Sequence, residues 1–273
     1  MNSAPASPTL LRPPLFDRPL YALDFGNTQI TVGAWNAGRI LARWHFKTEA
    51  ALQDPNSFWN EARKTWLNPT SLATLVCASV APEASSRVQR AKPDGVHWYD
   101  LQASSPFSFR NETRTPEKVG IDRLVNAEAA FREWGAPCLI LDIGTATTLC
   151  ALTQDHVGPV FRGGMITPGP GLLLQALHQK TALLPPVSPH FPQQSVGRTT
   201  KEAIQSGVFH GHTSLILGLI ARFRTELNLP DAPVILTGGW ASLFEPHLRP
   251  EIDALDSDLT LKGIASLYAS ISA

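Results

Sequence analysis

Hydrophobic and polar residues alternate around the same kind of turn in two places along the chain. Residues 20–35 and 139–152 each begin with an apolar run, reach Asp-x-Gly at 24–26 or 142–144, and continue with a second run of alternating character. A period of two is typical of half-buried strands, and glycine beside Asn or Thr favours a tight connection. The pattern therefore predicts one β-hairpin in each half of the chain.

Other segments change between the strand period and the helix period. Strands are predicted over 38–46, 72–80 and the first part of 232–244, and helices over 52–67, 116–135, 171–180, 200–226 and the last part of 232–244. Asp54 or Asn56 is the expected cap of the first helix, and Pro116 and Gly135 are the expected ends of the second. The proline-rich segment 182–197 is expected to be an extended loop. Strands that alternate with helices place the chain in the α/β class.

Length and composition fit one large domain or two ordinary ones. The chain has 273 residues, of which 43% are hydrophobic, and this is enough for a sizeable core. Lys plus Arg number 23, as do Asp plus Glu, so the net charge is zero with His neutral. Binding of nucleic acid through bulk positive charge is therefore not expected. No run approaches the ~20 apolar residues of a membrane helix, and no membrane partner is expected.

Cysteine usage and the first residues bear on the compartment. Cys77, Cys138 and Cys150 are widely spaced within apolar runs, which favours buried, reduced thiols in a cytoplasmic protein. Residues 1–19 are rich in proline and lack a basic stretch followed by an apolar core. We expect them to form a flexible leader and not a signal peptide.

The two Asp-x-Gly turns carry the first chemical signal. Glycine allows close approach of the backbone, and the N–H groups and hydroxyls that follow can bind phosphate oxygens. A carboxylate repels phosphate, so each Asp must act through a cation or a water. The pair of turns predicts a nucleotide handled with a divalent metal. One such turn alone is also an ordinary hairpin, and the Gly-Gly of "LTGGWA" (236–241) either accommodates a flat ring or merely joins a strand to a helix.

Six motifs in order resemble the type III pantothenate kinases, which belong to the superfamily of acetate kinases, sugar kinases, Hsp70 and actin. They are "DFGNT", "GIDR", "DIGTATT", "GGMITPGPGL", "TTKEAIQSG" and "TGGWA", and the resemblance runs from about Tyr21 to about Ile264. It implies an actin-like (ribonuclease H-like) α/β fold with duplicated halves around a nucleotide cleft. The expected parts are a leader, 1–19, a first domain, 20–115, and a second domain, 116–273, whose last helix can pack back on the first.

The resemblance also implies residue roles. Asp24 is expected to act through Mg²⁺, and Asp142 to bind a monovalent cation, K⁺ or NH₄⁺. The residues expected to contact ATP are Asp24, Phe25, Gly26, Asn27, Thr28, Gln29, Ile30, Thr31 and Thr145. Trp240 stands where the family usually has an acidic residue.

The acceptor site is implied in the same way. Pantothenate is expected to contact Gly120, Ile121, Asp122, Arg123, Thr200 and, weakly, Thr113, which stands where the family usually has Tyr. Asp122 is the expected general base. Its place at a helix start is expected to keep the carboxylate ionised and to lower its basicity. The alternative for "PEKVGIDR" is a helix cap with a surface Asp–Arg pair.

The function implied is ATP-dependent phosphorylation of pantothenate to 4′-phosphopantothenate, the first step of coenzyme A biosynthesis. A homodimer with the substrate site near the subunit interface is expected. One alternative is a non-catalytic accessory factor for transcription on the same scaffold, which would need none of Asp24, Asp122 and Asp142. Another is a different phosphotransferase or a phosphohydrolase of the superfamily, against which "GIDR" counts.

Overall fold

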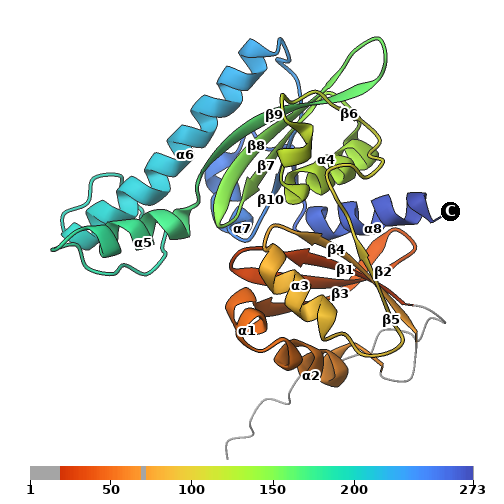
Figure 1. Cartoon of the computed structure of the whole chain (residues 1–273). Helices are drawn as coiled ribbons and strands as arrows, with labels where there is room; N and C mark the ends of the chain where they lie inside the picture. The colour runs from red at the N-terminus through yellow and green to blue at the C-terminus, as the bar shows by residue number, and fades with distance from the viewer. Residues whose placement is uncertain (1–18, 69–71, 273) are drawn as a thin grey trace, which may run out of the picture. The chain divides into compact units, whose positions relative to one another are not determined.

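The computed structural model describes residues 19–68 and 72–272, so the expected leader lies almost wholly outside the described residues. The chain forms two compact units, one of Met1–Gln102 with Ile264–Ala273 and the other of Ala103–Gly263 (Figure 1). Each unit has its own sheet and its own hydrophobic core. They are described in turn.

The first unit is built on a five-stranded sheet in the order β3-β2-β1-β4-β5. Its strands are β1 (Leu20–Phe25), β2 (Gln29–Asn36), β3 (Arg39–Lys47), β4 (Ala73–Ser79) and β5 (Val96–Asp100), and its helices are α1 (Thr48–Gln53), α2 (Pro55–Thr65) and α3 (Pro82–Arg90). β1 and β2 are antiparallel neighbours, which confirms the first predicted hairpin. The predicted strand 72–80 is confirmed as β4, between β1 and β5. Asp54, not Asn56, caps α2, because its carboxylate accepts a bond from the Asn56 N–H at 3.0 Å.

Large aromatic side chains anchor β1 in this unit. Phe25, Phe58 and Trp59 are at most 1% exposed. Tyr21 donates its hydroxyl to the Trp66 carbonyl at 2.8 Å, so its polar atom is satisfied in the core. The strand that leads to the first Asp-x-Gly turn is therefore fixed at its buried face.

The second unit contains a six-stranded sheet in the order β11-β10-β7-β8-β9-β6. The strands are β6 (Arg110–Asn111), β7 (Cys138–Ile143), β8 (Ala146–Gln154), β9 (Pro159–Pro168), β10 (Val234–Thr237) and β11 (Ala254–Leu255). β7 and β8 pair in antiparallel register, which confirms the second predicted hairpin. β10 lies parallel to β7, so the end of β10 reaches the turn that follows β7.

The helices of the second unit include one whose start differs from the prediction. They are α4 (Ile121–Trp134), α5 (Pro170–Lys180), α6 (Thr200–Glu226) and α7 (Ala241–Leu248); α8 (Leu259–Ile271) begins here and ends among residues of the first unit. The prediction of a helix from Pro116 is wrong: Pro116–Lys118 form a short 3₁₀ turn, and Val119 and Gly120 are extended. The helix ends at Gly135, whose φ of 77° suits glycine, as predicted.

The segment from α5 to α6 follows the predicted pattern. Both helices have the expected places, and no regular element interrupts 181–199 between them. α5 lies beside the N-terminal part of α6 (Figure 1). A capping box formed by Thr199 and Glu202 starts α6.

Candidate active site

The first Asp-x-Gly turn is open to solvent. Asn27, Thr28 and Gln29 are exposed, whereas Asp24 is partly buried at the end of β1. The Gly26 N–H donates to the Gln29 carbonyl at 3.0 Å. A methyl group on Gly26 would lie 2.9 Å from that same oxygen, so the turn requires glycine for space. The expected phosphate contacts of residues 24–31 thus lie together on one hairpin.

Two neighbours of this turn were missed in the sequence. Thr48, at the start of α1, donates its hydroxyl to the Gly26 carbonyl at 2.7 Å. His45 on β3 lies 2.5 Å from the Gln29 amide and 3.4 Å from the Thr31 hydroxyl through Nδ1. Pairing the two adjacent predicted strands would have placed His45 opposite Thr31, as the β2–β3 register does, and this was the available signal for His45.

The second turn is held on several sides by other parts of its unit. The Gly144 N–H donates to the Ala146 carbonyl at 3.0 Å, and the Gly169 N–H to the Thr145 carbonyl at 2.9 Å. The Trp240 N–H donates to the Ile143 carbonyl at 2.9 Å. The Gly-Gly turn after β10 and the start of α5 therefore both touch the second turn. Thr145 itself remains exposed, as an ATP contact requires.

Asp142 is at the centre of this arrangement. Its Oδ2 accepts a bond from Asn126 Nδ2 at 3.1 Å. A methyl group on Gly238 would lie 2.3 Å from its Oδ1, so that oxygen lies close against the Gly-Gly turn. Burial and the nearby charge of Asp122 raise the pKa of Asp142 to about 7, and the Asn126 bond opposes that rise. Asp122 and Asp142, two predicted site residues, are therefore close enough to interact.

Asp122 is in the first turn of α4, as expected, but its basicity is the reverse of the prediction. Burial raises its pKa from the usual 3.8, and the N–H and the charge of Arg123 oppose the rise. The Arg123 N–H donates to Asp122 Oδ1 at 2.8 Å. The helix terminus was expected to dominate, but loss of water around the carboxylate has the larger effect. The alternative of a surface Asp–Arg pair is also wrong, because neither residue is exposed.

Arg123 is held by two residues of the sheet. Its Nε donates to Cys150 Sγ at 3.2 Å, and its guanidinium carbon lies 5.7 Å from the centre of the Phe161 ring. Such stacking is typical of arginines that recognise anions. Cys77, Cys138 and Cys150 are all free and buried, as predicted.

A cavity of about 450 Å³ opens beside Arg123. Its charged lining consists of Arg114, Lys118, Arg123, Arg162 and Glu112, and this excess of positive charge suits a small acid. The volume is in the range typical of sites for small molecules.

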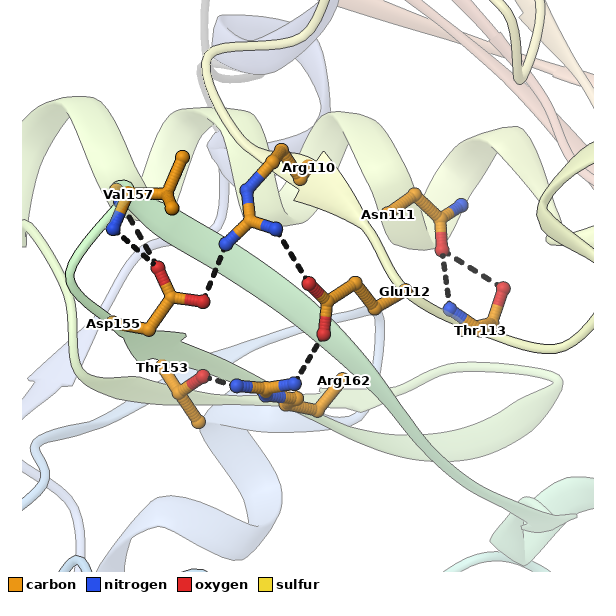
Figure 2. A network of polar contacts seen from close by, with 9 residues as sticks. Arg110, Asn111, Glu112, Thr113, Thr153, Asp155, Val157 and Arg162 are labelled. Carbon is orange, nitrogen blue, oxygen red and sulfur yellow. Dashed lines mark hydrogen bonds and ion pairs between the residues drawn. The ribbon is translucent and has the colours of Figure 1, made fainter.

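A chain of ion pairs fixes one wall of this cavity (Figure 2). Glu112 pairs with Arg110 at 2.6 Å through one oxygen and with Arg162 through the other. Arg162 Nε also donates to the Thr153 hydroxyl at 2.9 Å, and Arg110 pairs with Asp155 in the β8–β9 turn. Glu112 thereby neutralises part of the charge of Arg110 and Arg162. Neither Arg114 nor Lys118 has an ion pair among the described residues.

The remaining predicted acceptor residues are divided. Thr113 lines the cavity next to Gly163, Gly120 is the N-cap of α4, and Ile121 is its first residue. Thr200 is exposed at the start of α6, and the cavity lining does not include it. Asp24 to Thr31 belong to the other unit.

The donor chemistry fits the expected cations. Asp24 is a carboxylate, and carboxylate oxygens suit Mg²⁺. The turn that follows it is rich in N–H and hydroxyl groups that suit phosphate oxygens. Asp142 offers carboxylate oxygens in a largely buried place where its charge lacks a cationic partner near enough to lower its pKa. Asn126 Oδ1 is buried there without a partner in the described part of the chain. A positive ion would compensate Asp142. Within residues 19–68 and 72–272, no cluster of three or more His, Cys, Asp or Glu side chains has the geometry of a metal site.

Solved structures similar to this chain share its fold. A Campylobacter jejuni protein described as a conserved Baf family transcriptional activator aligns with a TM-score of 0.56 at 15% identity, over 92% of this chain and 98% of that one. An archaeal actin homologue aligns with a TM-score of 0.52 at 13% identity, over 93% and 100%. With the two sheet-containing units, these similarities show an actin-like α/β fold. No helix in the described ranges has the length and apolar character needed to cross a membrane.

Sequence relatives identify the family. Residues 20–222 match the type III pantothenate kinases. The type III pantothenate kinase of Shouchella clausii is 34% identical over 259 residues, which cover 91% of this chain and 98% of the relative. That of Rubrobacter xylanophilus is 35% identical over 261 residues, covering 92% and 97%. The chain therefore belongs to the type III pantothenate kinase family.

Proposed function

We propose that this protein transfers the γ-phosphoryl group of ATP to the primary hydroxyl of pantothenate, which yields 4′-phosphopantothenate in the first step of coenzyme A biosynthesis. The observation that carries the proposal is the pair Asp122–Arg123 at the start of α4. A carboxylate of raised pKa stands beside an arginine that lines a cation-rich cavity. A proton acceptor next to a site for an anion is what a hydroxy acid requires.

Each of these residues has a separate role in the phosphoryl transfer. Asp122 orients the hydroxyl of pantothenate and takes its proton. The hydroxyl oxygen forms a bond to the γ-phosphorus, and the bond from that phosphorus to the bridging oxygen breaks, leaving ADP. Arg123, with Arg114 and Lys118, holds the carboxylate at the far end of the acceptor. The raised pKa of Asp122 makes it a better base than an ordinary aspartate.

The first turn binds the ATP phosphates in this proposal. The exposed N–H and hydroxyl groups of Asn27, Thr28 and Gln29 suit phosphate oxygens. Asp24 would hold Mg²⁺ through water, and Asp142 would hold K⁺ or NH₄⁺. These cations would supply positive charge that neutralises the phosphates. Phosphoryl transfer depends mainly on such positioning and charge neutralisation.

We further propose a homodimer whose partner completes the acceptor site. Four exposed apolar side chains belong to α5, α6 and the segment between them: Leu172 is 39% exposed, Leu183 92%, Val196 76% and Leu215 40%. Burial of these side chains against a second copy would remove apolar surface from water. Thr200 does not line the cavity of its own subunit. In the dimer it would contact the pantothenate bound to the partner subunit. The three free thiols favour the cytoplasm.

A purely regulatory role is not proposed. Similarity at 15% identity to the Baf family protein shows the fold alone. The coupling of Asp122 with Asp142 and the cation-rich cavity support catalysis, because a regulator would need neither.

The proposal is tested by coupled detection of ADP with purified protein, ATP, Mg²⁺, K⁺ and pantothenate. The control substrate is the alcohol analogue of pantothenate, in which CH₂OH replaces the carboxylate. We expect efficient turnover of pantothenate and a much higher KM for the analogue, because the arginine and lysine side chains of the cavity then have no carboxylate to bind. Asp231→Asn, at an exposed position in the same unit, is the control for Asp122→Asn. Absence of pantothenate-dependent ADP from folded protein would overturn the proposal.

A further inference from the structure

Asn126 is a buried polar residue that none of the predicted roles includes. It lies on α4 one helical turn after Asp122 and is 2% exposed. Its Nδ2 donates to Asp142 Oδ2 at 3.1 Å. Because an amide nitrogen faces the carboxylate, its Oδ1 must point elsewhere, and that atom has no partner within the described ranges.

Stability alone does not account for an amide at this position. A buried polar atom without a partner costs about 1–3 kcal/mol. The neighbours of Asn126 on α4, Val125 and Ala127, are fully buried apolar residues. An apolar side chain would avoid the cost of the unpaired oxygen, so the amide is explained better by what its N–H does to Asp142.

The hydrogen bond restricts how the Asp142 carboxylate can turn. Oδ1 lies close to Gly238, where even a methyl group would be only 2.3 Å away. Oδ2 accepts the bond from Asn126 on α4. The Gly238 backbone near one oxygen and the Asn126 amide at the other therefore restrict the plane of the carboxylate. Asp122 and Asn126 stand at positions i and i+4 of α4, so they lie on the same face of the helix. The position of this one helix therefore sets the distance of both residues from Asp142.

We infer that Asn126 is a positioning residue: it holds the Asp142 carboxylate in the orientation that binds the monovalent cation. This inference rests on the proposed function, in which Asp142 holds K⁺ or NH₄⁺. Residues that orient a metal ligand through a hydrogen bond typically change ion affinity about 10–100-fold when altered. Asn126 acts through Asp142 and takes no part in the proton transfer.

Two variants separate positioning from packing. Asn126→Leu keeps the branched shape and removes the donor. Asn126→Ala also removes the donor, but the space it leaves can admit a water that donates to Asp142. We expect the K⁺ concentration for half-maximal stabilisation of the substrate-free protein to rise about 10–100-fold for Leu and less for Ala. The loss of stability should follow the opposite order: the melting temperature should fall further for Ala than for Leu, because Ala leaves a cavity.

The measurement is the melting temperature against K⁺ concentration, with choline replacing K⁺, and the K⁺ dependence of kcat on the same preparations. Thr213→Val is the matched control, since Thr213 is a buried polar residue whose hydroxyl bonds to the Phe209 carbonyl of its own helix; its K⁺ response should match the unaltered protein. In the Asp142→Asn background, Asn126→Leu should add no further loss of the K⁺ response.

The outcomes are distinct. A K⁺ response in Asn126→Leu equal to that of the unaltered protein, or additive losses in the double variant, overturns the positioning role alone. If Asn126→Leu does not fold, a normal K⁺ response in Asn126→Ala with lowered stability overturns it as well. Absence of any K⁺ response in the unaltered, folded protein overturns the cation role of Asp142 and this inference with it, while leaving phosphorylation of pantothenate to the ADP assay.

Discussion

The two Asp-x-Gly turns have nearly the same sequence pattern and very different surroundings. The first presents three consecutive exposed residues, Asn27 to Gln29, and its glycine carbonyl is held by Thr48. The second accepts backbone hydrogen bonds from the N–H groups of Gly169 and Trp240. The acid of the second, Asp142, also has a buried amide beside it and a pKa raised to about 7.

This difference shows that the motif provides only a shape, while its surroundings decide its chemistry. An exposed turn can leave a hydrated ion and flexible phosphates in contact with water, as Mg²⁺ prefers. An enclosed carboxylate with a raised pKa is costly to ionise unless a cation arrives. The proposed function places the divalent ion at the first turn and the monovalent ion at the second, and four predictions test that comparison.

The largest effect is expected at Asp122, the acid that interacts with Asp142 of the second turn. Asp122→Asn removes the proton acceptor and keeps the size of the side chain. General-base catalysis contributes about 10²–10⁴-fold, so kcat should fall within that range while ATP still binds. Single-turnover kinetics and the melting temperature are measured on one preparation. A normal kcat would remove Asp122 from the proton transfer whatever happens to stability.

Exchanging each turn's acid for its amide tests the assignment of the ions. Asp24→Asn should lower kcat/KM about 100-fold, as loss of one electrostatic stabiliser typically does, and raise the Mg²⁺ requirement. Asp142→Asn should raise the K⁺ requirement by at least the about 10–100-fold expected for Asn126→Leu, and leave the Mg²⁺ requirement nearly unchanged. Titrations of both variants with each ion check this. Identical ion profiles for the two variants would contradict the division between the turns.

Adding a methyl group to one glycine near each turn compares how tightly the turns are packed. Gly238 has a φ of 100°, and a methyl there would lie 2.3 Å from Asp142 Oδ1 and 2.6 Å from the Ile143 carbonyl carbon. Gly238→Ala should therefore cost about 1–3 kcal/mol in the free energy of unfolding. Gly26→Ala should cost less, because its methyl meets one carbonyl oxygen at 2.9 Å at an open turn. Denaturant unfolding measures both, and a larger loss for Gly26→Ala would reverse the comparison.

The smallest effect is the pH dependence of stability contributed by Asp142. Its pKa is about 7 in the folded protein against 3.8 as the usual value, so between these values the folded state binds more protons than the unfolded state. The free energy of unfolding then falls as pH rises through this window. Asp142→Asn removes that fall, so its melting temperature relative to the unaltered protein should rise by about 2–4 °C from pH 6 to pH 8 without K⁺, or about 1 kcal/mol.

K⁺ supplies the control for this last prediction. At pH 8 it should raise the melting temperature of the unaltered protein and narrow the difference from Asp142→Asn, because the ion stabilises the ionised carboxylate. A difference in melting temperature between the two proteins that is the same at pH 6 and pH 8 would show that Asp142 does not titrate in this range.

The sequence by itself determined the local parts of this protein. Period-two patterns located both hairpins, Asp54 and Gly135 marked helix ends, and apolar surroundings marked the three cysteines as buried. Each depends on residues a few positions apart, whose preferences are visible in the chain. The start of α4 was misplaced because Pro116 fits a 3₁₀ turn as well as the first turn of an α-helix.

Only the tertiary structure decided which of these parts touch. The order of the sheet sets β10 beside β7, and this brings Gly238 against Asp142 although nearly a hundred residues separate them. The packing of α4 on that sheet pairs Asn126 with Asp142 and takes water away from Asp122, which reversed the predicted change in its pKa. Burial and long-range neighbours outweigh a local helix terminus because removing water from a charge costs more than the helix dipole returns.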